Sequence, residues 1–236
     1  MANTYTITIK NRSQRSQSFL LFQDIPEPAT FQLGQVFDNV YQRAAKIVDD
    51  AQVTFQISSD VYAIHGTSNK SQDGVVEVKT SDYMEVKLGP NGSRCYLTTE
   101  NSYGRVSKFE KEDYSTQAEG AFIISSDKTF HYSKPTNMYF GVGAKIPSTG
   151  EIIPVQTYKT IPDVIAQVYP RARYYVAFGD YQPGSIVERR ALGYVLSIDF
   201  SGCEEHNATF ILDDEHDYIA DPVMYKSNIV WSVAPF

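Results

Sequence analysis

The residues best suited to chemistry in this chain are aromatic and basic side chains of its second half. The 236 residues include 17 Tyr and 13 Phe but a single Trp. Tyrosines and arginines can line an apolar cavity with a few polar groups, which is the usual composition of a site for an apolar or aromatic small molecule. The candidate ligand-binding residues are Tyr139, Tyr158, Arg171, Arg173, Tyr175, Tyr181 and Trp231, with Tyr174 beside them.

Two main function classes would use such a cavity. The first is a β-sandwich that binds an apolar or aromatic small molecule, or a partner, through Tyr-rich strands and loops. The second is a cofactor-independent cyclase or isomerase, which would hold one conformer of an apolar natural-product intermediate and stabilise its developing charge. No nucleophile elbow, H-E-x-x-H, C-x-x-C or phosphate-binding loop is present, so the sequence favours binding and leaves catalysis open. A third class is a lipid-binding or pore-forming module that docks through an exposed Tyr-rich surface.

An acidic window near the C-terminus is the candidate metal site. The interval 191–225 contains no Lys or Arg. Asp213, Glu215 and Asp217 have the spacing of the first three ligands of a calcium-binding loop. Tyr218 then stands where that loop requires Gly, and Met224 stands where it requires Glu. We therefore predict no cofactor, with calcium as the alternative.

The charge balance limits the partners. The chain carries 21 basic and 28 acidic residues, for a formal net charge of −7. Nucleic acid and an anionic membrane surface are disfavoured because both would repel such a chain. No apolar run reaches the roughly 20 residues that span a bilayer, and no signal peptide is evident. With only Cys95 and Cys203, the chain is expected in the reducing cytoplasm, where it could form a homo-oligomer.

The elements that must position these residues are mostly strands. In the first twenty residues, Tyr5, Ile7 and Ile9 alternate with polar residues, which is the pattern of a half-buried strand. The apolar run 18–22 is typical of a strand covered on both faces. The polar stretch between them predicts a β-hairpin over residues 4–23.

Further short strands are expected along the rest of the chain, separated by turns. The pair Gly141 and Gly143 predicts a bulge or a close approach of two backbones. Helices are expected at 36–48, from an apolar stripe, and at 160–170, between two prolines. The fold predicted for residues 1–236 is mainly β, a single-domain antiparallel β-sandwich or flattened barrel with one or two short peripheral helices. The strands are expected at 53–57, 61–66, 75–79, 84–88, 121–125, 137–142, 152–158, 173–179, 192–200, 208–213 and 228–233.

Three segments together resemble a group of uncharacterised fungal and bacterial proteins. They are TYTITIKNRSQRSQSFLLFQDIPEP at 4–28, TSDYMEVKLGP at 80–90 and RYYVAFGDYQPG at 173–184. The resemblance implies a cytosolic β-sandwich. It carries no shared activity, so no catalytic residue transfers from it. If the source is a fungus, it implies a role beside secondary metabolism.

Overall fold

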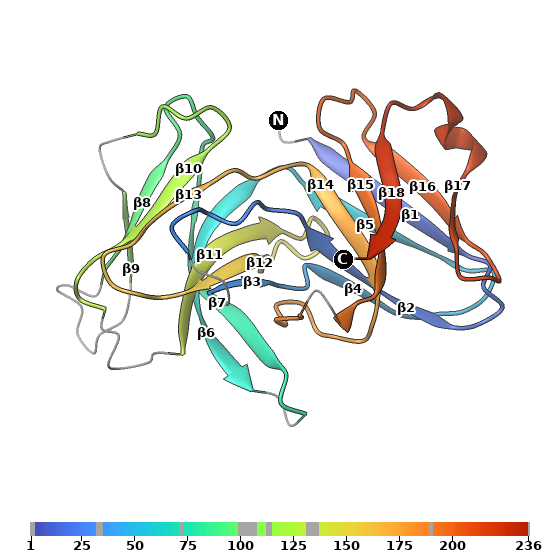
Figure 1. Cartoon of the computed structure of the whole chain (residues 1–236), viewed down its shortest axis with the longest axis horizontal. Helices are drawn as coiled ribbons and strands as arrows, with labels where there is room; N and C mark the ends of the chain where they lie inside the picture. Colours follow the sequence, from blue (N-terminus) through green and yellow to red (C-terminus); the bar gives the residue numbers. More distant parts are fainter. Residues whose placement is uncertain are drawn as a thin grey trace.

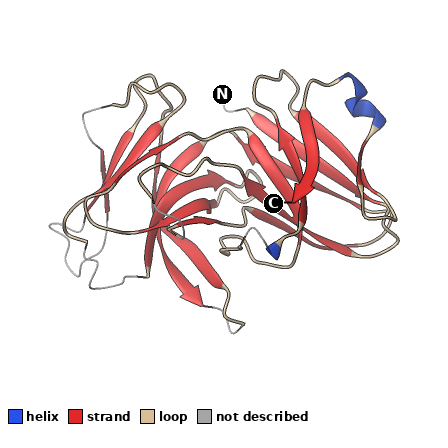
Figure 2. Cartoon of the chain, in the orientation of Figure 1, coloured by secondary structure: helices blue, strands red, loops and turns tan. Residues whose placement is uncertain are grey.

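The computed structural model describes residues 3–31, 35–70, 73–98, 108–111, 115–130, 137–188 and 191–235. Strands make up nearly all of its regular structure, and short helical turns lie outside the sheets (Figure 2). The predicted mainly β class is confirmed, and the sheets of the described residues form sandwiches rather than a closed barrel. No helix among the described residues is long and apolar enough to cross a membrane.

The first sandwich holds both ends of the chain (Figure 1). Sheet I has the order β17-β16-β1-β5, and sheet II has the order β18-β15-β14-β2-β4. The two sheets pack face to face, with the rings of Tyr5 and Tyr174 at 6.2 Å. The strands of sheet I are β1 (Thr4–Asn11), β5 (Gln52–Ser58), β16 (Asn207–Leu212) and β17 (Tyr218–Ala220). Those of sheet II are β2 (Gln17–Gln23), β4 (Gln42–Ile47), β14 (Arg173–Phe178), β15 (Tyr194–Asp199) and β18 (Val230–Pro235).

The second sandwich is built from the middle of the chain. Sheet III has the order β13-β10-β8-β9, and sheet IV has the order β3-β12-β11-β6-β7. One continuous cluster of buried apolar residues contains side chains of all four sheets. The strands of sheet III are β8 (Arg94–Thr98), β9 (Lys108–Lys111), β10 (Phe122–Ser126) and β13 (Ile165–Val168). Those of sheet IV are β3 (Val36–Asp38), β6 (Val61–Lys70), β7 (Val76–Glu85), β11 (Met138–Lys145) and β12 (Ile152–Lys159).

The two sandwiches repeat one topology. Each four-stranded sheet has a parallel pair at its centre, β1 with β16 in sheet I and β8 with β10 in sheet III, flanked by antiparallel strands. In chain order, β1, β2, β4 and β5 take the same places in the first sandwich as β10 to β13 in the second. Likewise β14 to β17 match β6 to β9. The chain is thus two structural repeats, and each repeat supplies half of each sandwich.

The repeats share a turn at the end of their first strand. The amide of Asp50 donates to the carbonyl of Asn11 at 2.9 Å, and the amide of Asp163 donates to the carbonyl of Asp127 at 3.2 Å. Asp50 and Asp163 both have left-handed backbones, with φ of 63° and 59°. The side-chain oxygens of Asn11 and Asp127 each accept the N–H of the residue two positions on. The first strand of each repeat, β1 or β10, therefore ends in a turn of the same local geometry.

The helices predicted at 36–48 and 160–170 are wrong. The first segment forms β3 and β4, and the second contains β13. In the first segment the chain passes from sheet IV to sheet II, and Val40 and Tyr41 between the strands are fully buried. Because Val40 and Tyr41 are both buried, the apolar positions of this segment resemble the apolar stripe of a helix. The Val and Tyr content of the segment favours strands. In the second, the left-handed Asp163 interrupts any helix. Helical structure occurs instead near the C-terminal end of the described chain, in the 3₁₀ helix η2 (Pro222–Lys226).

The predicted hairpin at 4–23 is also wrong, although both strands exist. β1 lies in sheet I and β2 in sheet II, so the turn between them connects two sheets. The expectation of a strand covered on both faces is confirmed. Phe19 and Leu21 point into the main core, and Leu20 and Phe22 belong to a second apolar cluster on the other face of sheet II.

Candidate functional site

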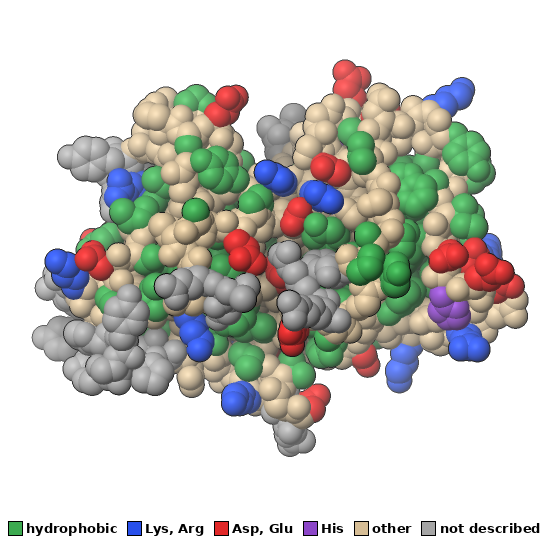
Figure 3. Space-filling model, in the orientation of Figure 1, with side chains coloured by type: hydrophobic (Ala, Val, Ile, Leu, Met, Phe, Trp, Pro, Cys, Tyr) green, Lys and Arg blue, Asp and Glu red, His purple; other side chains and the backbone are tan. Residues whose placement is uncertain are grey.

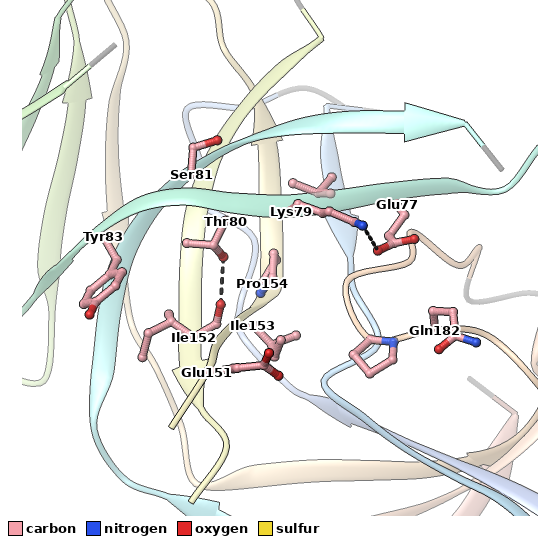
Figure 4. A pocket seen from close by; sticks show the side chains of 12 residues that line it. Glu77, Lys79, Thr80, Ser81, Tyr83, Glu151, Ile152, Ile153, Pro154 and Gln182 are labelled. Carbon is pink, nitrogen blue, oxygen red and sulfur yellow. Dashed lines mark hydrogen bonds and ion pairs between the residues drawn. The ribbon is translucent and has the colours of Figure 1, made fainter. Parts of the chain in front are cut away.

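A groove of about 710 Å³ lies where the two sandwiches meet, and it opens to solvent. Its walls come from three places: residues 77–81 and Tyr83 of β7, residues 151–154 at the start of β12, and Gln182 with Pro183 from the first sandwich (Figure 4). The volume falls within the usual 300–1,000 Å³ range, roughly, of small-molecule sites. We take this groove as the candidate functional site.

Sheet IV forms the groove by curling on itself. β7 and β12 are separated by two other strands in the sheet, yet the hydroxyl of Thr80 donates to the carbonyl of Ile152 at 2.8 Å. The curl depends on β11, whose register with β12 shifts between Val142 and Gly143. A Cβ on Gly141 would lie 2.1 Å from the carbonyl oxygen of Gln156. The bulge and close backbone approach predicted from these glycines are therefore confirmed.

The third wall is a loop of the first sandwich that is bonded to the edge of β7. The amide of Val78 donates to the carbonyl of Gly184 at 3.0 Å, and the amide of Ile186 donates to the carbonyl of Val76 at 2.8 Å. The side chain of Asn39 also donates to the carbonyl of Gly184 at 2.9 Å. Gly184 has φ of +85°, and a Cβ there would lie 2.5 Å from the oxygen of Val78. Only glycine fits this junction without strain.

The groove offers an apolar floor with an aromatic end and polar sides. Ile152, Ile153 and Pro154 form the floor (Figure 4), and Pro183 adds to the apolar lining. Lys79 and Glu77 form an ion pair at 3.6 Å along one side. Tyr83 is 55% exposed, but its ring is braced edge-on by Tyr62 at 5.6 Å. A few polar groups around an apolar surface can orient an amphipathic ligand.

The structure does not gather the predicted ligand-binding residues into one cavity. Tyr139 and Tyr158 belong to sheet IV, in the second sandwich. Tyr158 is fully buried, its hydroxyl donates to Gln156 at 2.7 Å, and burial raises the pKa of this hydroxyl. Tyr139 is almost fully buried. These two tyrosines therefore pack in the protein interior and do not line the groove.

The other predicted residues lie in the first sandwich. The guanidinium of Arg173 is 5.7 Å from the ring of Tyr175, and the two residues line a small hollow of about 150 Å³. Arg171 precedes β14 and is exposed, so the two arginines are not on one strand. Tyr181 packs on the second apolar cluster. Trp231 lies on β18, with its ring 5.3 Å from that of Phe210.

Sequence reasoning missed the groove because it placed a turn between 75–79 and 84–88. The structure has one continuous strand there, β7, from Val76 to Glu85. Thr80, Ser81 and Asp82 resemble a turn in composition. The alternation of Val76, Val78 and Thr80 was an available sign of the strand, because these positions share one of its sides. The bulge opposite His65 and Gly66 then places Met84 on the other side.

The acidic segment forms the turn between β16 and β17. The carboxylate of Asp213 accepts the amides of Glu215 at 3.0 Å and Asp217 at 2.9 Å. This carboxylate therefore stabilises the turn itself. Within the described ranges, no group of three His, Cys, Asp or Glu side chains is placed to hold a metal ion. Calcium binding by Asp213, Glu215 and Asp217 stays an untested prediction.

The comparisons with known proteins give one result at the family level. The family model described as RhiA matches residues 2–220, which is most of the chain and includes every groove residue. Neither a curated protein nor a solved structure matches the chain. The family match extends from β1 to β17 and ends before η2 and β18.

Proposed function

The chain belongs to the RhiA family, and from that premise we propose that it binds a small amphipathic molecule with an aromatic or apolar ring in the groove between the two sandwiches. The observation that carries the proposal is the groove itself. It has the volume of a small-molecule site, and its lining combines Ile152 and Pro154 with polar groups at the sides.

The walls support binding because they are fixed before any ligand arrives. Three separate chain segments meet there, and the hydrogen bonds of Thr80 and Gly184 lock them together. A preformed site avoids the entropic cost of ordering loops when a ligand binds. Tyr83 and Gln182 lie at different ends of the groove, so a planar ring can pack against Tyr83 with its polar substituent directed along the groove toward Lys79 (Figure 4).

Binding is favoured over catalysis by what the polar groups of the groove already do. Lys79 is paired with Glu77, and the hydroxyl of Thr80 is donated to Ile152. Groups engaged in this way orient a ligand more readily than they transfer protons, because proton transfer would break the contacts that shape the wall. The cyclase alternative requires a reacting group aimed at the ligand, and the binding proposal does not.

An NMR titration with 2-naphthol tests the proposal. This neutral bicyclic aromatic alcohol avoids repulsion by the net negative charge of the chain. We expect saturable shifts of the backbone amides of residues 77–83, 151–153, 182 and 184. Ile152→Glu, which places a charge on the apolar floor, should weaken binding by about tenfold or more.

Ile165→Glu is the matched control. Ile165 is an exposed isoleucine on β13, away from the groove, so its variant should bind 2-naphthol like the original chain. Equal weakening by both variants would show that surface charge alone reduces binding, and this result would contradict the proposal.

The cellular setting is a further part of the proposal. No disulfide joins Cys95 and Cys203, which supports a reducing compartment such as the cytoplasm. If the source is a fungus, the resemblance to uncharacterised fungal and bacterial proteins supports a role beside secondary metabolism. Fractionation of the source cells tests the first point, and the identity of neighbouring genes tests the second.

A further inference from the structure

The C-terminal strand is an exposed, uncharged sheet edge. All six residues of β18 are exposed, and its only paired neighbour among the described strands is β15. Large apolar side chains with 37–75% exposure lie on β18 itself, on its neighbour β15 and on η2, and Figure 3 shows hydrophobic side chains gathered over this part of the molecule. They are Tyr194, Val223, Tyr225, Val230, Trp231 and Val233. We call this set the C-terminal patch.

Other sheet edges in the described part of the chain are protected. β4 carries Arg43, which pairs with Asp180, and it contains the left-handed Lys46. The edge of β7 is covered by the loop around Gly184. β9 contains charged residues, while β3, β13 and β17 have only three or four residues. The remaining edge strand, β5, has seven residues and no charge, but its exposed side chains are polar, and the Gln42 side chain donates to the carbonyl of Gln56 at 2.7 Å. Natural proteins use charges, short strands and covering loops to prevent edge-to-edge pairing. β18, with six residues and no ionisable side chain, has only Pro235 at its end.

The strand β18 is additional to the common architecture. β18 has no counterpart in the other sandwich when the two repeats are matched strand by strand. It also lies after residue 220, where the match to the family ends. Neither the fold of the repeats nor the family match therefore accounts for a long apolar edge at this position.

Charge indicates what covers this edge. Two copies of a chain with net charge −7 repel each other over most of their surfaces. No side chain from 230 to 235 ionises, so antiparallel pairing of two β18 strands places no like charges opposite each other. Such pairing is self-complementary, as an isologous two-fold interface requires. It would satisfy the free backbone groups of the edge and bury Val230 and Trp231.

We propose that two copies of this chain form a dimer by antiparallel pairing of their β18 strands, covered by the C-terminal patches. The dimer does not depend on a ligand in the groove, because no patch residue lines it. The expected product is a continuous sheet across both subunits, formed by sheet II of each copy.

Sedimentation velocity on the full chain over a concentration series tests this proposal. We expect a concentration-dependent dimer, and we expect Val230→Lys to weaken self-association by about tenfold or more, since an edge lysine opposes strand pairing. Val48→Lys is the control: Val48 is 59% exposed and lies outside the patch, so this variant should dimerise normally. Val230 is 69% exposed, and unchanged thermal unfolding of the monomeric variant would show that it folds.

A cysteine crosslink tests the geometry. In a Cys203→Ser background, Ser232→Cys lies at the centre of β18 and should form a disulfide between two copies, while Val48→Cys should not. A monomer at every concentration would overturn the proposal. A dimer that survives Val230→Lys would do the same. So would a monomer that binds phosphatidylcholine–phosphatidylserine vesicles through the patch, because the occupant would then be a lipid surface.

Discussion

The amide of Val78 donates to the carbonyl of Gly184 at 3.0 Å, and this bond joins the edge of the second sandwich to a loop of the first. The loop, held at this point, forms one wall of the groove. The shape of the candidate site therefore depends on a contact between the two structural repeats, since β7 belongs to the first repeat and the loop to the second.

Gly184→Ala should damage both stability and binding. Alanine in this left-handed backbone conformation would lower the free energy of unfolding by about 1 kcal/mol. The close contact of its Cβ with the carbonyl oxygen of Val78 would lower it by about 2 kcal/mol more. Gly74 has the same φ of +85° but open space around its Cβ position, so Gly74→Ala should lose only the first contribution. Urea unfolding of both variants measures the difference. Equal losses of stability in the two variants would show that the contact with Val78 contributes nothing.

Asn11→Ala should destabilise the first sandwich by about 2–3 kcal/mol. The Asn11 side chain is fully buried, and its amide donates to the carbonyls of Arg15 at 2.7 Å and Ile47 at 2.9 Å. Alanine leaves both carbonyls without this donor. Asn69→Ala, at an exposed position, should change stability by less than about 0.5 kcal/mol. Thermal or urea unfolding decides, and a similar loss for both variants would contradict the assigned role.

Asp127 should make stability depend on pH in the acid range. Burial alone would raise its pKa, but hydrogen bonds from Thr129, Thr98 and Tyr96 outweigh burial and lower it. The stability contributed by this carboxylate is therefore fully present above its unfolded pKa of 3.8, and it is lost as the pH falls toward the lower folded pKa. The stability difference between the original chain and Asp127→Asn should shrink on acidification below pH 3.8. A constant difference would show that the carboxylate charge does not matter.

Calcium should leave the melting temperature unchanged. The carboxylate of Asp213 already accepts the amides of Glu215 and Asp217, so binding an ion there would compete with the turn. Calorimetry with added calcium and with EDTA measures this directly. A rise in melting temperature with calcium, lost in Asp213→Ala, would show that the acidic turn is a metal site after all.

Most of the strands could be predicted from the sequence, because period-2 burial leaves a local pattern. Ile7 and Ile9 show it in β1, and the run from Phe19 to Phe22 marks a strand buried on both faces. The pairing could not be predicted. The parallel pairs β1 with β16 and β8 with β10 join distant segments, and no local rule sets such partners.

The candidate site was harder to predict than the fold, for a related reason. Residue type alone pointed to tyrosines, but Tyr158 and Tyr174 proved to be core residues with buried hydroxyls. The groove depends instead on Gly141 and Gly184, whose role is to let backbones approach. The first glycine gave a usable signal as part of a Gly-x-Gly pair within a strand. The second became informative only once β7 was placed beside its loop.

The NMR titration with 2-naphthol shows whether a small aromatic molecule binds in the groove. We expect one saturable set of amide shifts, at residues 77–83, 151–153, 182 and 184, with Trp231 unaffected because it lies on β18 outside the groove. Shifts confined to β18 and η2, or shifts that grow without saturation, would contradict the groove as the binding site.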